Sequence, residues 1–144
     1  MRPASTILRE SMVDYKYVYI LDTKELTSSS GGVYGGHYSS VYGATTTKSV
    51  NPSDIISGYL LKQGYIRVPE LNPTIANETM IVSYGESGRR VAGLGYAIEV
   101  TIQFTTATTH TLIASTTAEG QGETEADDIR IAIYRALDAL FPKN

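Results

Sequence analysis

A strictly alternating segment, followed by a second extended segment, constrains the fold of this 144-residue chain more than any other feature. Between residues 94 and 105 an apolar side chain occupies every second position, which is typical of a half-buried β-strand. These residues are Tyr96, Ile98, Val100, Ile102 and Phe104. A threonine-rich connection leads to a β-branched run over residues 111–120. The two segments therefore predict an antiparallel hairpin.

A helix is predicted directly after this hairpin, because Thr124 stands where an N-cap belongs and acidic residues fill the first turn. The apolar residues that follow recur at steps of three and four: Ile129, Ile133, Ala136, Leu137 and Leu140. We expect this stripe to cover the apolar face of the hairpin. Gly120 and Gly122 could cradle a phosphate at the start of the helix, but the surrounding carboxylates oppose an anion and favour a simple turn.

The rest of the chain predicts further strands and one more helix. Residues 15–21 have two largely apolar faces, so this strand is expected inside the sheet. Asn51 and Pro52 begin a helix that Gly64 ends, and short strands are predicted at 65–68 and 79–84. Residues 85–95 are expected to form a polar, glycine-rich connection.

This order of elements predicts an α+β fold. The simplest packing is a two-layer sandwich, in which a mixed four- to five-stranded sheet carries two helices on one face. Residues 1–144 are expected to form a single domain, because this length and 42% apolar content suit one core. Residues 1–12 show no clear period and are expected to be a loose N-terminal tail.

A tyrosine-, glycine- and serine-rich segment at residues 28–47 holds no apolar stripe and is predicted to be a flexible loop. Its candidate binding residues are Tyr34, His37, Tyr38 and Tyr42. Tyrosines surrounded by glycine and serine are also typical of antibody paratopes, so the loop could be a recognition surface. The alternative is an insertion that binds nothing.

Arg89 and Arg90 form the only adjacent basic pair and are the remaining binding candidates. Two guanidinium groups could clamp a carboxylate or a phosphate. A pair of solvated loop residues is the alternative interpretation.

Composition argues against several classes of function. A formal net charge of -3 without clustered basic residues argues against a nucleic-acid partner. With no cysteine and two widely separated histidines, His37 and His110, the sequence predicts no metal site and no cofactor. No catalytic residues are predicted, since Ser87 lacks the Gly-x-Ser-x-Gly spacing of a hydrolase and no other catalytic constellation is recognisable. We therefore expect a protein that is not an enzyme.

The sequence resembles the small envelope lipoproteins of unknown function from Gram-negative bacteria, including those encoded on Bacteroides conjugative transposons. The resemblance runs from residue 15 to residue 141. It rests on the motifs YKYVYIL at 15–21, LKQGY at 61–65, MIVSYG at 80–85, TTAEG at 116–120 and LFP at 140–142.

This resemblance implies a secreted protein with a lipid-bearing cysteine ahead of Met1, located in the periplasm or at the outer membrane. The sequence departs from the family in containing no cysteine, so the anchor would lie outside it. The resemblance also implies a non-enzymatic binding or assembly module whose partner is an envelope protein or a cell-wall component. A link to a conjugative transposon is part of the same implication. The alternative is a small-ligand or glycan-binding domain that uses the tyrosine-rich loop.

Overall fold

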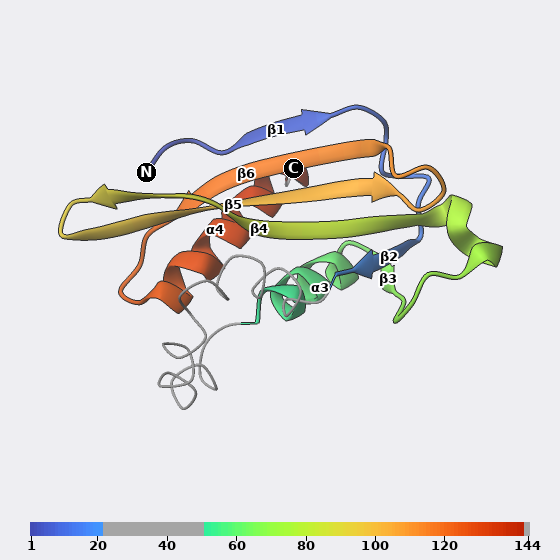
Figure 1. Ribbon diagram of the computed structural model, residues 1–144, viewed down its shortest axis with the longest axis horizontal. Coiled ribbons are helices and arrows are strands. Elements are labelled where there is room, and N and C mark those ends of the chain that lie inside the picture. Colours follow the sequence, from blue (N-terminus) through green and yellow to red (C-terminus); the bar gives the residue numbers. More distant parts are fainter. Residues whose placement is uncertain (22–50, 143–144) are drawn as a thin grey trace.

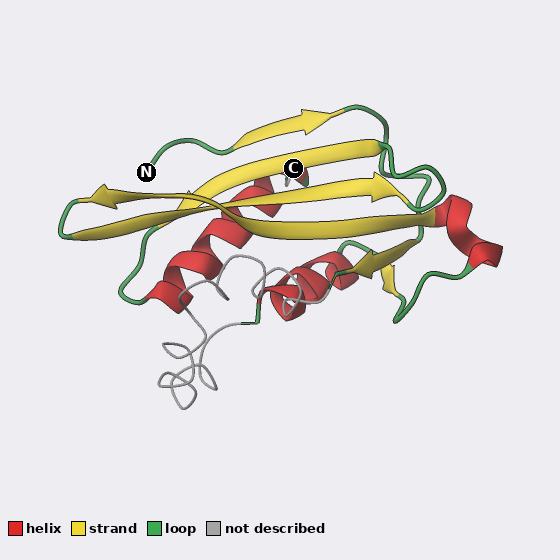
Figure 2. Cartoon of the chain, viewed as in Figure 1, coloured by secondary structure: helices red, strands yellow, loops and turns green. Residues whose placement is uncertain are grey.

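The computed structural model describes residues 1–21 and 51–142, which form one six-stranded sheet with helices packed on it (Figure 1). The strands are β1 (Ser5–Leu8), β2 (Tyr17–Ile20), β3 (Ile66–Arg67), β4 (Thr79–Ala92), β5 (Gly95–Thr106) and β6 (Leu112–Gly120). The helices are α3 (Pro52–Lys62) and α4 (Glu125–Leu140), with a 3-10 helix, η1 (Pro73–Glu78), before β4 (Figure 2).

The sheet is mixed, in the order β1-β6-β5-β4-β2-β3. Strand β2 is parallel to β3 and β4, whereas the other neighbours are antiparallel. The predicted α+β class with a mixed sheet is therefore confirmed. The expected number of four to five strands was too low.

The additional strand comes from the segment expected to be a loose tail. Residues 5–8 pair with β6, so that Ser5 lies opposite Thr117 and Leu8 opposite Ala114. All four residues of β1 are exposed, so the strand is held mainly by its backbone and carries no alternating apolar signal. The sequence pattern therefore gave no indication of it.

Strand β4 also extends beyond the prediction. It was expected to end near Tyr84, but its pairing with β5 continues to Ala92, with a register shift between Glu86 and Gly88. A turn at Gly93 and Leu94 then leads into β5, and Gly93 has a positive φ of 62°. The polar connection predicted over residues 85–95 is in fact the outer half of a long hairpin.

The helices and the sheet share a single hydrophobic core. Val18 and Ile20 of β2 lie beside Met80 and Val82 of β4, which confirms the interior position predicted for this strand. Both helices contribute to the same cluster of buried side chains, so α3 and α4 pack on one face of the sheet. The most deeply buried helix residues are Ile56, Leu60, Ala132, Ile133, Ala136 and Leu137.

The predicted helix boundaries are confirmed by their caps. The Asn51 side chain accepts a hydrogen bond from the Ser53 backbone N–H, and Thr124 Oγ1 accepts one from the Asp127 N–H at 3.1 Å. Gly64 follows α3 with φ of 102°, the left-handed conformation that ends a helix.

The Gly-x-Gly corner allows β6 and α4 to approach closely. A Cβ atom on Gly120 would lie 1.9 Å from the Asp128 carbonyl oxygen and 2.4 Å from the Ala132 nitrogen. The Gly122 N–H donates a hydrogen bond to the Asp128 carboxylate, which is itself buried. This corner therefore serves strand-helix packing, and its Gly122 amide is bound to the protein's own carboxylate.

We predict that Leu137→Ala lowers the free energy of unfolding by about 2 to 5 kcal/mol, because it leaves a cavity in the core beneath α4. Arg130→Ala, on the exposed side of the same helix, should change it by less than about 0.5 kcal/mol. Urea denaturation followed by circular dichroism measures both. A loss under about 1 kcal/mol for Leu137→Ala would show that the helix face is wrongly assigned.

We further predict that Gly120→Ala destabilises the protein by about 1 to 3 kcal/mol or more, since the added methyl group would overlap the α4 backbone. The matched control is Gly85→Ala, because a Cβ atom there meets nothing within 4 Å. The same denaturation experiment compares them. Equal effects of the two substitutions would contradict a specific contact at Gly120.

Candidate functional site

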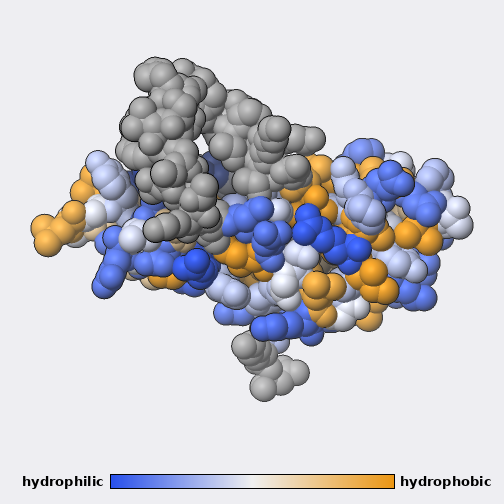
Figure 3. Space-filling view, turned by 90° about the horizontal axis from the view of Figure 1, so that it is seen from below, coloured by the Kyte–Doolittle hydropathy of each residue, from blue (hydrophilic) through white to orange (hydrophobic). Residues whose placement is uncertain are grey.

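The outer end of the β4–β5 hairpin projects beyond the rest of the sheet, at the left of Figure 1. Pairing of β6 with β5 ends at Ile98, and pairing of β2 with β4 ends at Val82. We call residues 89–97 the hairpin arm. Its tip exposes three large apolar side chains: Val91 at 70%, Tyr96 at 54%, and Leu94, which is fully exposed. Hydrophobic atoms protrude at the same end in the space-filling view (Figure 3).

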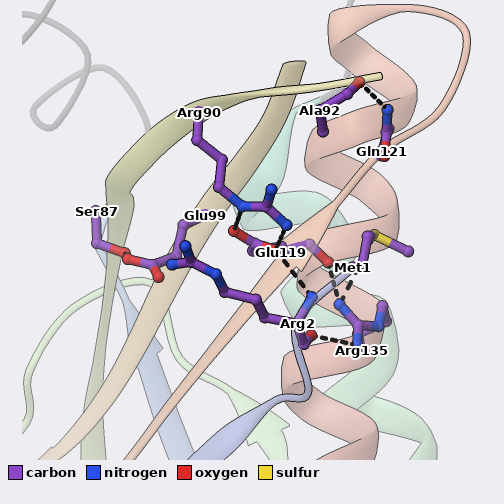
Figure 4. A network of polar contacts seen from close by, with 9 residues as sticks. All are labelled: Met1, Arg2, Ser87, Arg90, Ala92, Glu99, Glu119, Gln121 and Arg135. Atoms are coloured by element: carbon purple, nitrogen blue, oxygen red, sulfur yellow. Dashed lines mark hydrogen bonds and ion pairs between the residues drawn. The ribbon is translucent and has the colours of Figure 1, made fainter. Parts of the chain in front are cut away.

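An ion pair holds the base of the arm to the body of the sheet. Arg90 Nε and Nη2 donate hydrogen bonds to the two carboxylate oxygens of Glu119, at 2.7 and 2.9 Å (Figure 4). Because β5 lies between β4 and β6, this bidentate pair reaches across a whole strand. Ala97, the β5 residue opposite Arg90, is fully buried.

Glu119 also joins the N-terminus and α4 to this network. Its Oε1 accepts a hydrogen bond from the Arg2 backbone N–H at 3.0 Å. Arg135 of α4 donates to the Glu119 carbonyl oxygen at 2.5 Å and to the Arg2 carbonyl oxygen at 2.8 Å (Figure 4). One buried glutamate thus connects two strands and the N-terminal segment, and α4 is tied to it through Arg135.

These partners change the ionisation of Glu119. The hydrogen bonds from Arg90, followed by the one from the Arg2 N–H, lower the pKa of Glu119 to about 2. The hydrogen bonds between Arg90 and Glu119 also raise the pKa of the Arg90 guanidinium. The pair therefore stays ionised at neutral pH.

Arg89 braces the arm from the other side. Its guanidinium forms ion pairs with Glu86 at 2.8 Å and with Glu125, in the first turn of α4, at 3.2 Å. The hydrogen bond to Glu86 is the main cause of a raised pKa of Arg89. Near the tip, Gln121 Nε2 donates to the Ala92 carbonyl oxygen at 2.7 Å. The arm is therefore held in place by contacts from β6, α4 and their connection.

The structure shows where the predicted basic pair lies and what each arginine binds. Arg89 and Arg90 lie on a strand and not in a loop, and their opposite partners are Ile98 and Ala97, so they point to different faces of the sheet. Each guanidinium binds a carboxylate of the chain itself. The other candidate residues, Tyr34, His37, Tyr38 and Tyr42, lie outside the described residues, as does the loop at 28–47.

A groove lies where the β1–β2 connection meets the C-terminal ends of both helices. It has a volume of about 780 Å³. Val13 is 85% exposed on it, and the Tyr65 hydroxyl donates to the Met12 carbonyl oxygen at 3.0 Å beneath. We call this site the terminal groove; its apolar lining consists of Leu8, Met12, Val13, Tyr65, Leu140 and Phe141.

The aromatic rings at the C-terminal end of α4 support this groove. Phe141 contacts Tyr59, Tyr65 and Phe104, with ring centroids 6.0 to 6.3 Å apart. Tyr15 also lines the groove, and its hydroxyl donates a hydrogen bond to Glu10. This bond is the main cause that raises the pKa of Tyr15 to about 12. Sequence reasoning missed the groove, because its residues are scattered and part of it belongs to the segment expected to be a loose tail.

Within residues 1–21 and 51–142, no three acidic or histidine side chains are grouped to hold a metal ion. No helix in these two ranges has the length and apolar character needed to cross a membrane.

No family model matches the sequence, and no curated protein matches it. Solved structures with a similar fold include PelC from Paraburkholderia phytofirmans, described as a dodecamer, which is 13% identical with a TM-score of 0.58. That alignment covers 94% of this chain and 96% of PelC. A point variant of the PelC dodecamer is 15% identical with a TM-score of 0.53, over 98% of both chains.

A third similar structure is a PDZ domain protein from Parabacteroides distasonis. It is 9% identical with a TM-score of 0.54, and the alignment covers 99% of this chain but 36% of that one. At these identities the similarity establishes the fold alone.

We predict that the network at the base of the arm makes stability depend on pH in the acid range. Because the folded-state pKa of Glu119 lies below its usual value of 4.5, its stabilising contribution is complete above about pH 4.5 and is lost as the pH falls towards 2. The difference in unfolding free energy between wild type and Glu119→Gln should therefore shrink over that range.

Chemical denaturation at a series of pH values measures this difference. Arg90→Gln serves as the partner variant, since removing the main cause of the lowered pKa should remove most of the same pH dependence. A wild-type advantage over Glu119→Gln that stayed constant from pH 6 to pH 2 would contradict the assignment.

Proposed function

We propose that this protein is a non-enzymatic assembly module of the bacterial cell envelope, which works by binding other protein chains through its hairpin arm. The observation that carries the proposal is the tip of the arm, where Val91, Leu94 and Tyr96 are exposed together. Hydrogen bonds at its base fix the arm to the rest of the sheet. Exposed apolar residues gathered in this way are typical of protein interaction surfaces.

The bracing of the arm supports a binding role. Arg90 and Gln121 fix the hairpin from one side and Arg89 from the other, so the tip is held in place before any partner arrives. A rigid recognition element loses less conformational entropy on binding than a mobile one. The polar contacts at the base thus favour affinity at the apolar tip.

The similar structures support assembly as the more specific form of binding. PelC, whose fold is similar over nearly the whole length of both chains, forms a dodecamer. The partner in the proposal is accordingly a protein of the envelope, and copies of this chain are the first candidates.

The envelope location rests on the resemblance to small Gram-negative lipoproteins. We propose that the protein is held at the periplasmic side of a membrane, in particular the outer membrane, by a lipid attached ahead of Met1. A link to a conjugative transposon belongs to the same proposal.

The assembly proposal predicts that the purified chain self-associates. Light scattering coupled to size-exclusion chromatography, over a wide range of concentration, should give a mass above that of the 15.6 kDa chain. A strictly monomeric protein at every concentration would contradict self-assembly.

The location predicts lipidation of the protein in its own host. Growth with an alkyne-modified fatty acid, followed by capture of the native protein with a specific antibody, should show the label on it. Native protein that carries no label and fractionates with the cytoplasm would overturn the envelope proposal.

A further inference from the structure

We propose that the tip of the hairpin arm of one copy inserts into the terminal groove of a second copy, so that copies join head to tail. This inference rests on the proposed assembly function, and it names the contact through which the assembly forms.

The arm and the terminal groove lie at opposite ends of the folded domain. The arm includes the start of β5, whereas the groove is lined by Leu8 near the other end of that strand. Leu8 pairs with Ala114, which in turn pairs with Phe104 of β5. The ten steps along the strand from Tyr96 to Thr106, at about 3.3 Å each, separate the arm from the groove by roughly 33 Å. An arm cannot reach the groove of its own chain, but it can reach that of a neighbour.

The size and chemistry of the groove suit the tip. With a volume of about 780 Å³, the open groove has room for the three apolar side chains of the tip. Leu8, Val13 and Phe141 present apolar surface to it. The tip offers a leucine at its apex with a valine and a tyrosine behind it.

Charge does not oppose the contact. The segment 9–16 along the groove contains two basic residues, Arg9 and Lys16, and two acidic residues, Glu10 and Asp14. On the arm, Arg89 and Arg90 are both bound to carboxylates of their own chain. Neither surface therefore carries an excess of one sign that a second copy would have to overcome.

The small area of the contact favours a closed assembly. Three side chains bury less surface than a stable isolated interface of about 1,000 Å² or more requires. A head-to-tail contact uses two different surfaces on each copy, so every copy in a ring makes two contacts. Ring closure thus stabilises an interface that would be weak in an isolated dimer.

The test uses two single variants of the full chain and their mixture. Leu94→Asp places a charge on the tip, and Val13→Asp places one in the groove. Wild type should form assemblies larger than a dimer, and each variant alone should be monomeric, with association weakened at least about tenfold. An equimolar mixture restores one arm-in-groove contact, because Val13→Asp keeps an intact arm and Leu94→Asp keeps an intact groove. It should therefore form a one-to-one heterodimer only at high protein concentration, with weaker association than the wild-type assembly.

Sedimentation velocity measures wild type, each variant and the mixture. Leu71→Asp is the matched control, since Leu71 is 42% exposed and belongs to neither surface, and it should assemble like wild type. Thermal unfolding followed by circular dichroism checks that each variant is folded. If Leu94→Asp were unfolded, Val91→Asp would replace it, because Val91 is also exposed on the tip.

The outcomes separate this inference from the proposed function. A wild-type protein that stays monomeric overturns both. A wild type that assembles while both variants still assemble like it overturns the arm-in-groove contact and leaves self-assembly standing. A single variant that forms a dimer by itself indicates a symmetric interface and overturns the head-to-tail arrangement.

Discussion

The close contact between the end of β6 and the backbone of α4 determines most of this architecture. Gly120 lies against Asp128 and Ala132, so the helix starts directly beside the sheet and buries its apolar stripe on β5 and β6. The same placement sets Arg135 against the Glu119 carbonyl oxygen and Glu125 against Arg89. Core packing and the bracing of the arm thus depend on one corner that has no room for a side chain.

The hairpin arm combines a polar base with an apolar tip, and the two parts have different roles. At the base, the buried carboxylate of Glu119 is paired and hydrogen-bonded, as an ionised group away from water must be. At the tip, the Leu94 side chain is fully exposed, so it adds no buried apolar area to the stability of the fold. In the assembly that we propose, this side chain is the part of the arm that a partner covers.

Local patterns predicted the helices, because the N-caps Asn51 and Thr124 bond to residues two or three positions further on. They also predicted the central hairpin, because the alternation over 94–105 can be recognised without knowing a distant partner. They did not predict β1, which depends on backbone pairing with a strand over 100 residues away. The glycines of residues 85–95 concealed the outer half of β4. Arg89 and Arg90 were recognised as unusual, but their partners Glu86, Glu125 and Glu119 are brought to them by the sheet and by α4.

The pairing of the first strand with the last has a consequence for folding kinetics. Strand β1 precedes its partner β6 by more than 100 residues. The edge of the sheet is therefore completed late, after the β5–β6 hairpin and α4 provide a surface, and such distant contacts slow folding. Until then Ile7 and Leu8 remain without a neighbouring strand. Before β6 is in place, the unpaired backbone of this segment is open to pairing with another chain, as unpaired strand edges are in general.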